Sequence, residues 1–155
     1  MPDPMVPEEA ARQGAAPRID RVLVLEDVDT DFRLLQRHLQ RQGIGAHCLQ
    51  VRGGADLRAA LQATDWQVVL ADHQLTGVDF DTELALLRQC LPEVPVVLVS
   101  GTIGEELAVD LLRRGVADFV LKDRLARLVP AIERCVRDVQ LRREADRAAQ
   151  ALAES

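Results

Sequence analysis

The chain has 155 residues and 48% hydrophobic residues, enough for one complete hydrophobic core and too little for two ordinary domains. Its formal net charge of -6 argues against a nucleic-acid-binding surface, because such surfaces gather Lys and Arg on a basic domain. The three cysteines form no CxxC pair, which indicates a reducing, cytoplasmic environment, and no apolar run approaches the roughly 20 residues that span a membrane.

The first 19 residues show no apolar periodicity. They include four prolines and mix Ala, Gly and charged residues, a composition that opposes regular structure. They also lack the basic start and apolar middle of a secretory signal. We therefore expect a disordered tail over residues 1–19, a folded domain over 20–130 and a helical extension over 131–155.

Five short apolar runs of strand length follow the tail. They are RVLVLE, GAHCLQV, WQVVLAD, VPVVLVS and ADFVL. Between them, apolar residues recur at helical spacing, as in Phe32, Leu35 and Leu39. Strands that alternate with helices predict right-handed crossover units, and strands that are apolar on both faces suit a sheet covered on both sides. The sequence therefore predicts an α/β fold with a doubly wound, five-stranded parallel sheet.

Polar residues stand where four of these strands end. Glu26 and Asp27 follow the first strand, Asp72 the third, Ser100 the fourth and Lys122 the fifth. The second strand ends in VRGG and contributes no obvious chemical group. Ligands of open α/β sheets bind at the carboxyl ends of the strands, so we expect these five side chains at one edge.

The residue types in this set suit phosphoryl chemistry. Mg²⁺ prefers a few carboxylate oxygens, Lys binds phosphate as a point charge, and a hydroxyl can donate to a phosphoryl oxygen. The set predicts a site that holds a phosphoryl group on a carboxylate nucleophile, Asp72. For Asp29 and Asp31 we favour a structural role at the start of the next helix, with Asp29 as its N-cap.

Residues 21–128 resemble a receiver domain of the two-component response regulators. The acids, the hydroxyl and the lysine stand at the expected places, and the SGTIGEE and LKD motifs resemble one subgroup of these receivers. The resemblance implies a flavodoxin-like strand order, 2-1-3-4-5. It also implies a phosphoacceptor switch rather than an enzyme, with a histidine kinase or a histidine phosphotransfer protein as the partner.

The resemblance assigns a role to each site residue. The implied set is Asp72 as phosphoacceptor; Glu26, Asp27, Asp72 and the backbone carbonyl of Gln74 as ligands of Mg²⁺ or Mn²⁺; Ser100, Lys122 and Phe119 in phosphoryl binding and switching; and Gln74 and Thr102 as modulators of phosphoryl lifetime. Phosphorylation would shift the face formed by the fourth helix, the fifth strand and the fifth helix. The chain departs from the family pattern at Thr76 and Asp123, where Pro is common, and at Phe80, where Gly is common.

Three other interpretations of the acidic stretch can be compared with this one. An EF-hand loop starting at Asp27 would need Gly in place of Phe32 and Glu in place of His38, so it fails. A haloacid-dehalogenase-type phosphatase would use Asp27 as nucleophile, but it leaves Asp72 unexplained. A receiver-like scaffold that signals without phosphorylation is the third alternative.

The residues after Val139 carry a weak heptad pattern. Its apolar positions are Leu141, Ala145, Ala148 and Leu152. Two such repeats rarely define a coiled coil, so a homodimer helix and a solvated tail are equally favoured. The face that responds to phosphorylation is a second candidate for dimer formation. We expect neither nucleic acid nor a membrane as a partner.

Overall fold

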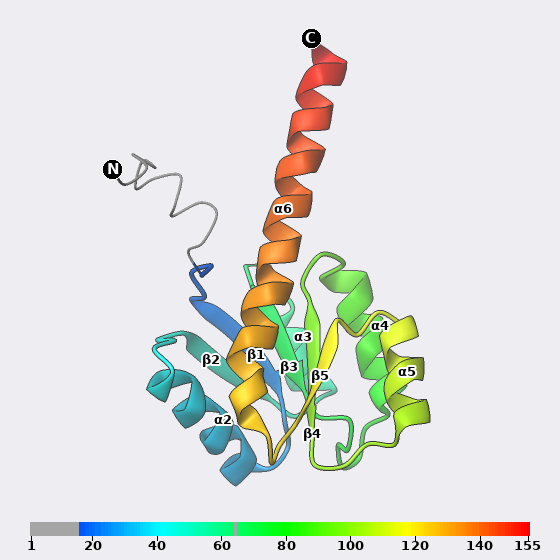
Figure 1. Ribbon diagram of the computed structural model, residues 1–155. Coiled ribbons are helices and arrows are strands. Elements are labelled where there is room, and N and C mark those ends of the chain that lie inside the picture. The colour runs from blue at the N-terminus through cyan, green and yellow to red at the C-terminus, as the bar shows by residue number, and fades with distance from the viewer. Residues whose placement is uncertain (1–15, 64) are drawn as a thin grey trace, which may run out of the picture.

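The computed structural model describes residues 16–63 and 65–155, which form a five-stranded sheet (Figure 1). The order is β2-β1-β3-β4-β5, and all neighbouring strands are parallel. The predicted doubly wound, flavodoxin-like sheet is confirmed. The strands are β1 (Arg21–Leu25), β2 (His47–Val51), β3 (Val68–Ala71), β4 (Val96–Ser100) and β5 (Asp118–Leu121).

Helices connect the strands and cover both faces of the sheet. The cluster of buried side chains on one face includes residues of α2 and α6, and the cluster on the other face includes residues of α3, α4 and α5. The helices are α2 (Asp29–Arg41), α3 (Ala55–Ala60), α4 (Phe80–Cys90), α5 (Glu105–Arg113) and α6 (Leu128–Glu154), with a short 3-10 helix, η1 (Leu125–Arg127), before α6.

The residues of β1 show why the sheet is buried on both sides. Val22 and Val24 belong to the cluster with α2 and α6, whereas Leu23 and Leu25 belong to the opposite cluster. All four side chains are at most 2% exposed. Successive side chains of a strand point to opposite faces, so a run of consecutive apolar residues stabilises both layers, by about 2 kcal/mol for each buried side chain.

The last helix extends well beyond the sheet (Figure 1). Its first part closes the core through Leu128, Ile132 and Val136, whereas Leu141 and Leu152 are 57% and 76% exposed. Pro130 lies in the first turn, where its missing N–H costs no helical hydrogen bond. The long C-terminal helix is confirmed, and its pairing with a second copy stays a prediction.

The predicted domain boundaries stay predictions. The helix α6 runs without a break across the boundary expected at residues 130 and 131. Residues 1–15 of the predicted disordered tail lie outside the described residues. Within residues 16–63 and 65–155, no helix is both long and apolar enough to cross a membrane.

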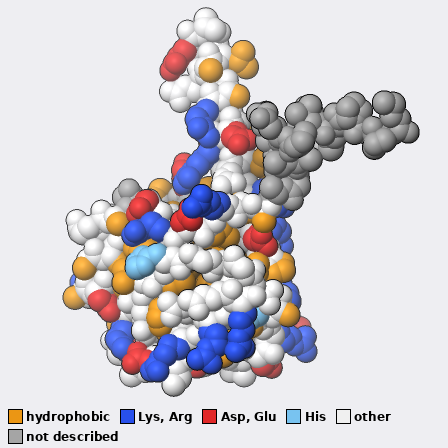
Figure 2. All heavy atoms as spheres, turned by 90° about the vertical axis from the view of Figure 1, so that its left-hand side faces the viewer, with side chains coloured by type: hydrophobic (Ala, Val, Ile, Leu, Met, Phe, Trp, Pro, Cys, Tyr) orange, Lys and Arg blue, Asp and Glu red, His pale blue; other side chains and the backbone are white. Residues whose placement is uncertain are grey.

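Charge is not spread evenly over the molecule despite the formal net charge of -6. Arg33, Arg37 and Arg41 are exposed at four-residue spacing along α2. Figure 2 shows basic side chains gathered on the side of the molecule that carries this helix. Side chains at this spacing lie on the same face of a helix, so α2 presents a basic stripe to the solvent.

Candidate functional site

The carboxyl ends of the strands bring the predicted site residues to one edge of the sheet. The backbone N–H of Asp72 donates to the carbonyl of Leu25 at 2.9 Å, which places the residue after β3 beside the end of β1. The backbone N–H of Lys122 donates to the carbonyl of Ser100 at 2.8 Å. These bonds continue the parallel pairing past the ends of the strands. Backbone pairing therefore brings the predicted site residues together at this edge of the sheet.

The ammonium group of Lys122 lies among three carboxylates. Its Nζ donates to Glu26 Oε1 at 2.6 Å, to Asp31 Oδ2 at 2.7 Å and to Asp72 Oδ2 at 2.8 Å. One oxygen from each acid lies within 4.8 Å of the others. The group thus contains three acids around one cation, an excess of negative charge that can accommodate a further positive charge.

Asp72 is buried and both of its carboxylate oxygens have partners. Oδ2 accepts from Lys122, while Oδ1 accepts from the backbone N–H of Gln74 at 2.9 Å and from Ser100 Oγ at 3.4 Å. The side chain of Ser100 is also buried. The carboxylate therefore has a fixed orientation, with the Ser100 hydroxyl at the limit of hydrogen-bond distance.

Asp27 lies beside this cluster rather than among its three convergent acids. Its Oδ2 accepts from the backbone N–H of Thr76 at 2.8 Å, across the loop that follows β3. Its Oδ1 is buried and has no hydrogen-bond partner among the described residues. A buried carboxylate oxygen normally has a partner, so this oxygen has unused capacity to bind a cation or a water.

Burial and charge alter the acid–base properties of the site. Burial raises the pKa of Glu26 to about 7, helped by the nearby charge of Asp72 and opposed by the hydrogen bond from Lys122. Burial also disfavours the charged form of Lys122, but its hydrogen bonds to Asp31, Asp72 and Glu26 outweigh that effect and raise its pKa. Partial burial of Asp27 is likewise outweighed by the hydrogen bonds from Thr76, which lower the pKa of Asp27.

The structural role favoured for Asp31 from the sequence is wrong, because its carboxylate belongs to the cluster. A signal for this position exists in the sequence. Asp31 lies four residues before Leu35 and eight before Leu39, the two buried residues of α2. Residues four apart share a helix face, so Asp31 had to lie on the inner side of α2, in the turn nearest the strand ends.

The predicted N-cap role of Asp29 is also wrong. The helix α2 begins at Asp29, Val28 precedes it as the N-cap, and no side-chain hydrogen bond caps this end. The Asp29 carboxylate instead accepts hydrogen bonds from Gln50 Nε2 at 3.0 Å and from Arg52 at 2.5 Å. These bonds lower its pKa. The end of β2, which the sequence left without a chemical role, therefore supplies two side chains that contact the acidic loop.

Two further predicted residues, Phe119 and Thr102, do not belong to the cluster. Phe119 is half-buried on β5 and packs against the core on the side of α5, and Thr102 is exposed in the loop after β4. The peptide bond between Lys122 and Asp123 is trans. His73 makes an edge contact with Phe80, with ring centroids 5.3 Å apart, so its imidazole packs on α4.

The donor set at this edge fits a hard divalent cation. Mg²⁺ and Mn²⁺ prefer carboxylate and carbonyl oxygens, and the cluster offers three convergent acids beside the unpartnered oxygen of Asp27. The ammonium of Lys122 contacts the same three acids. A cation bound here would share carboxylates with this lysine.

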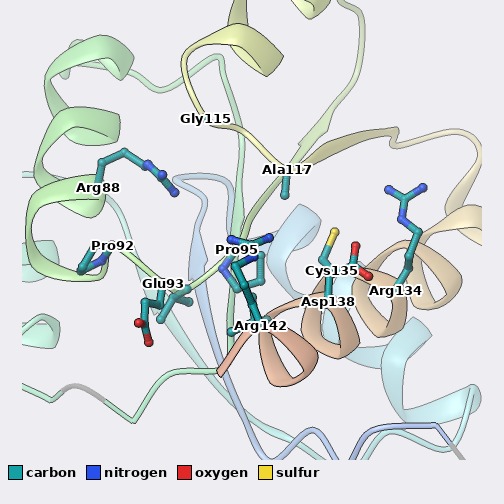
Figure 3. Close-up of a pocket in the computed structure, with 12 residues that line it drawn as sticks. Arg88, Pro92, Glu93, Pro95, Gly115, Ala117, Arg134, Cys135, Asp138 and Arg142 are labelled. Atoms are coloured by element: carbon teal, nitrogen blue, oxygen red, sulfur yellow. The ribbon is translucent and has the colours of Figure 1, made fainter. Parts of the chain in front are cut away.

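A cavity of about 470 Å³ lies at the opposite edge of the sheet, where β4 and β5 begin (Figure 3). Its lining comes from α4, from the loop before β4 and from α6, and it includes Arg88, Glu93, Asp138 and Arg142. None of the predicted site residues lines it. The predicted site residues therefore lie at the other edge of the sheet, away from this cavity.

Comparison with known proteins assigns the chain to a family. The family model "Response regulator receiver domain" matches residues 22–133. The chain belongs to this family. Receivers of this family bind Mg²⁺ at an acidic pocket, and this chain has a cluster of acidic residues formed by Glu26, Asp31 and Asp72.

Several curated regulators are similar to this receiver. The nitrogen assimilation regulatory protein NtrX of Azorhizobium caulinodans is 32% identical over 126 residues, which cover 79% of this chain and 27% of the relative. The regulatory protein AtoC of Escherichia coli is 30% identical over 104 residues, which cover 67% of this chain and 22% of the relative. The chain thus spans about a quarter of the length of these relatives.

Solved structures agree with this fold. NtrX from Brucella abortus has a TM-score of 0.75 and 28% identity, with 84% of this chain and 29% of that chain covered. The receiver domain of a putative LuxO repressor from Vibrio parahaemolyticus has a TM-score of 0.71 and 21% identity, with 82% of this chain and 97% of that chain covered.

Another relative, from Escherichia coli, is named as the DNA-binding transcriptional regulator NtrC. The absence of a nucleic-acid partner stays a prediction for this chain.

Proposed function

We propose that this receiver takes a phosphoryl group onto Asp72 from a phosphohistidine of a histidine kinase or a phosphotransfer protein. The observation that carries the proposal is the environment of Asp72, which is buried at the sheet edge with Lys122 on one oxygen and Gln74 and Ser100 on the other. In the transfer, a lone pair of the Asp72 carboxylate forms a new O–P bond while the N–P bond of the donor breaks. The electron pair of that bond stays on the imidazole nitrogen, which takes a proton from solvent.

The proposed cation ligands are Glu26, Asp27, Asp72 and the backbone carbonyl of Gln74. The unpartnered Asp27 oxygen and the convergent acids support this set. When bound, Mg²⁺ or Mn²⁺ would neutralise part of the phosphoryl charge and orient its oxygens. Asp31 contacts Lys122 from the more exposed side, and we assign it the role of a counter-ion that holds the ammonium near Asp72.

The proposed response begins at Ser100. Its hydroxyl lies at 3.4 Å from Asp72, so a small movement would let it donate to a phosphoryl oxygen, while Lys122 donates from the other side. Ser100 pairs with Leu121 in the register of β4 and β5, which couples this movement to the strand that carries Phe119. The face formed by α5, β5 and α6 would then change its packing, as a shift between two states.

The phosphatase alternative has less support. Its second acid, Asp29, is bound by Gln50 and Arg52, and the group of convergent acids includes Asp72 but not Asp27. The proposed chemistry is limited to accepting and losing the chain's own acyl phosphate.

Intact mass after incubation with Mg²⁺ and acetyl phosphate tests the proposal. We expect one added phosphoryl group in the wild type and none in Asp72→Asn or in a sample with excess chelator. Phosphorylation that survives in Asp72→Asn but is lost in Asp27→Asn would support the phosphatase. No addition in any sample would favour a scaffold that signals without phosphorylation.

A further inference from the structure

The acidic loop between β1 and α2 is held by side chains from the end of β2. Gln50 Nε2 donates to the backbone carbonyl of Glu26 at 3.0 Å, and one guanidinium nitrogen of Arg52 donates to the carbonyl of Asp27 at 2.7 Å. Two consecutive carbonyls of the loop thus have side-chain partners from a neighbouring strand. The backbone of β2 adds a third contact, because the carbonyl of Val51 accepts from the N–H of Glu26 at 2.9 Å.

Asp29 completes this arrangement. Its Oδ1 accepts from the second terminal nitrogen of Arg52 at 2.5 Å and from Gln50 Nε2 at 3.0 Å. The planar guanidinium therefore bridges a carbonyl and a carboxylate of the same loop, which a Lys ammonium cannot reproduce with the same geometry. The pair also cancels charge, so Arg52 can contact the loop without adding a net positive charge beside a cation site.

The position of Arg52 is itself fixed. Its backbone N–H donates to Asp56 Oδ2 at 2.7 Å, and the N–H of Gly53 donates to Asp56 Oδ1 at 2.9 Å. Gly53 has φ of +115°, a backbone conformation that favours glycine. The Asp56 carboxylate thus fixes the start of the turn after β2, from which the side chain of Arg52 reaches the acidic loop.

These contacts determine how Asp27 is presented. Arg52 holds its carbonyl, and the Thr76 N–H holds its Oδ2, so the backbone and one carboxylate oxygen are both anchored. The other oxygen, Oδ1, is buried without a partner among residues 16–63 and 65–155. A residue anchored at two points has little freedom to change the direction of that oxygen.

We infer that Arg52, supported by Gln50 and Asp29, is a positioning residue that fixes Asp27 for binding of the divalent cation. This inference rests on the proposed function, because it assumes that the cation binds beside Asp72. It gives the end of β2 a role in the site through the backbone of the acidic loop, without direct contact between Arg52 and the cation.

The test compares Arg52→Gln, Arg52→Lys and Arg58→Gln with the wild type. Arg58 is exposed on α3 and makes no ion pair or side-chain hydrogen bond within the described part of the chain, so Arg58→Gln is a control for the loss of one positive charge. The affinity for Mn²⁺ alone is measured by the electron paramagnetic resonance signal of the free ion. Amide hydrogen exchange of Thr76 is measured in the metal-free protein, and urea unfolding checks that each variant is folded.

The positioning role and the simple charge effect predict opposite changes of the Mn²⁺ affinity in Arg52→Gln. Removal of a positive charge near a cation site should tighten Mn²⁺ binding, whereas loss of positioning should weaken it, by about tenfold as for other outer partners of metal ligands. We expect weaker binding and faster exchange at Thr76 in Arg52→Gln, most of the same loss in Arg52→Lys, and wild-type values within twofold in Arg58→Gln.

Tighter or unchanged Mn²⁺ binding in Arg52→Gln, with Thr76 exchange as in the wild type, would overturn the inference. Wild-type Mn²⁺ affinity in Arg52→Lys would also contradict the inference, because a positive charge at position 52 would then be enough for cation binding. Failure of the proposed function has a different signature. In that case the wild type would bind Mn²⁺ no better than Asp27→Asn, whatever residue stands at position 52.

Discussion

Replacement of Lys122 by Met should destabilise the cation-free protein and make it more responsive to Mg²⁺. The ammonium contacts Glu26, Asp31 and Asp72, and its removal leaves three acids that converge within 4.8 Å. Loss of one partner of a fully buried ion pair costs about 3–5 kcal/mol. Here the cluster is open on the side of Asp31, which is 36% exposed, and Glu26 can take up a proton, so we expect about 2 kcal/mol.

This destabilisation corresponds to a fall in melting temperature of about 4–8 °C for a chain of this size. Urea unfolding can be followed through Trp66, which is the only tryptophan and is buried. Arg18→Met is the matched control, because it removes one positive charge from an exposed pair with Asp20. Mg²⁺ should stabilise Lys122→Met more than the wild type, because no ammonium competes for Glu26 and Asp72.

Two results would refute this reasoning. The first is a loss of stability in Lys122→Met no larger than in Arg18→Met, which would mean that the ammonium does not offset repulsion among the acids. The second is weaker stabilisation by Mg²⁺ in Lys122→Met than in the wild type, which would mean that the lysine and the cation do not share carboxylates.

Further predictions concern individual residues of the site and the core. Burial raises the pKa of Glu26 to about 7, so below this pH a bound proton must leave before a cation binds. Calorimetry should therefore show an Mg²⁺ affinity about tenfold higher at pH 8 than at pH 6, with proton release on binding. An Mg²⁺ affinity independent of pH would contradict this. Asp31→Asn should cost only about 0.5 kcal/mol in urea unfolding, because Lys122 keeps two buried partners, and a loss as large as that of Lys122→Met would show that Asp31 is the main anchor. Gly115→Ala should cost about 2 kcal/mol, because Gly115 has φ of +106°, a backbone conformation that strains any residue with a Cβ. Gly45→Ala is the control, because a Cβ at Gly45 would meet nothing within 4 Å, and equal stabilities of the two variants would contradict the expectation.

The sheet could be predicted because the sequence pattern of each strand is local and recurs five times along the chain. Each strand is a short apolar run between helical patterns, and the position after each strand follows from the run itself. This is why Asp72 and Lys122 could be placed at one edge before their 2.8 Å contact was known. The order of the strands followed from the family resemblance.

The parts that sequence reasoning missed depend on side-chain direction. Asp31 shares a face with Leu35, yet acids at the start of a helix often cap it, and a structural role of that kind was favoured. Arg52 follows β2 and contacts Asp27 and Asp29, which follow the neighbouring strand β1. These contacts depend on the register of β1 with β2 and on the turn after β2. Neither spacing nor composition carries that information.

Identification of the phosphorylated residue tests the central proposal most directly. The protein would be incubated with Mg²⁺ and acetyl phosphate and then treated with borohydride, which reduces an aspartyl phosphate to homoserine and releases phosphate. Peptide sequencing by mass spectrometry would then locate the homoserine. The proposal predicts homoserine at position 72 only. Homoserine at position 27 or 31, with Asp72 unchanged, would contradict it.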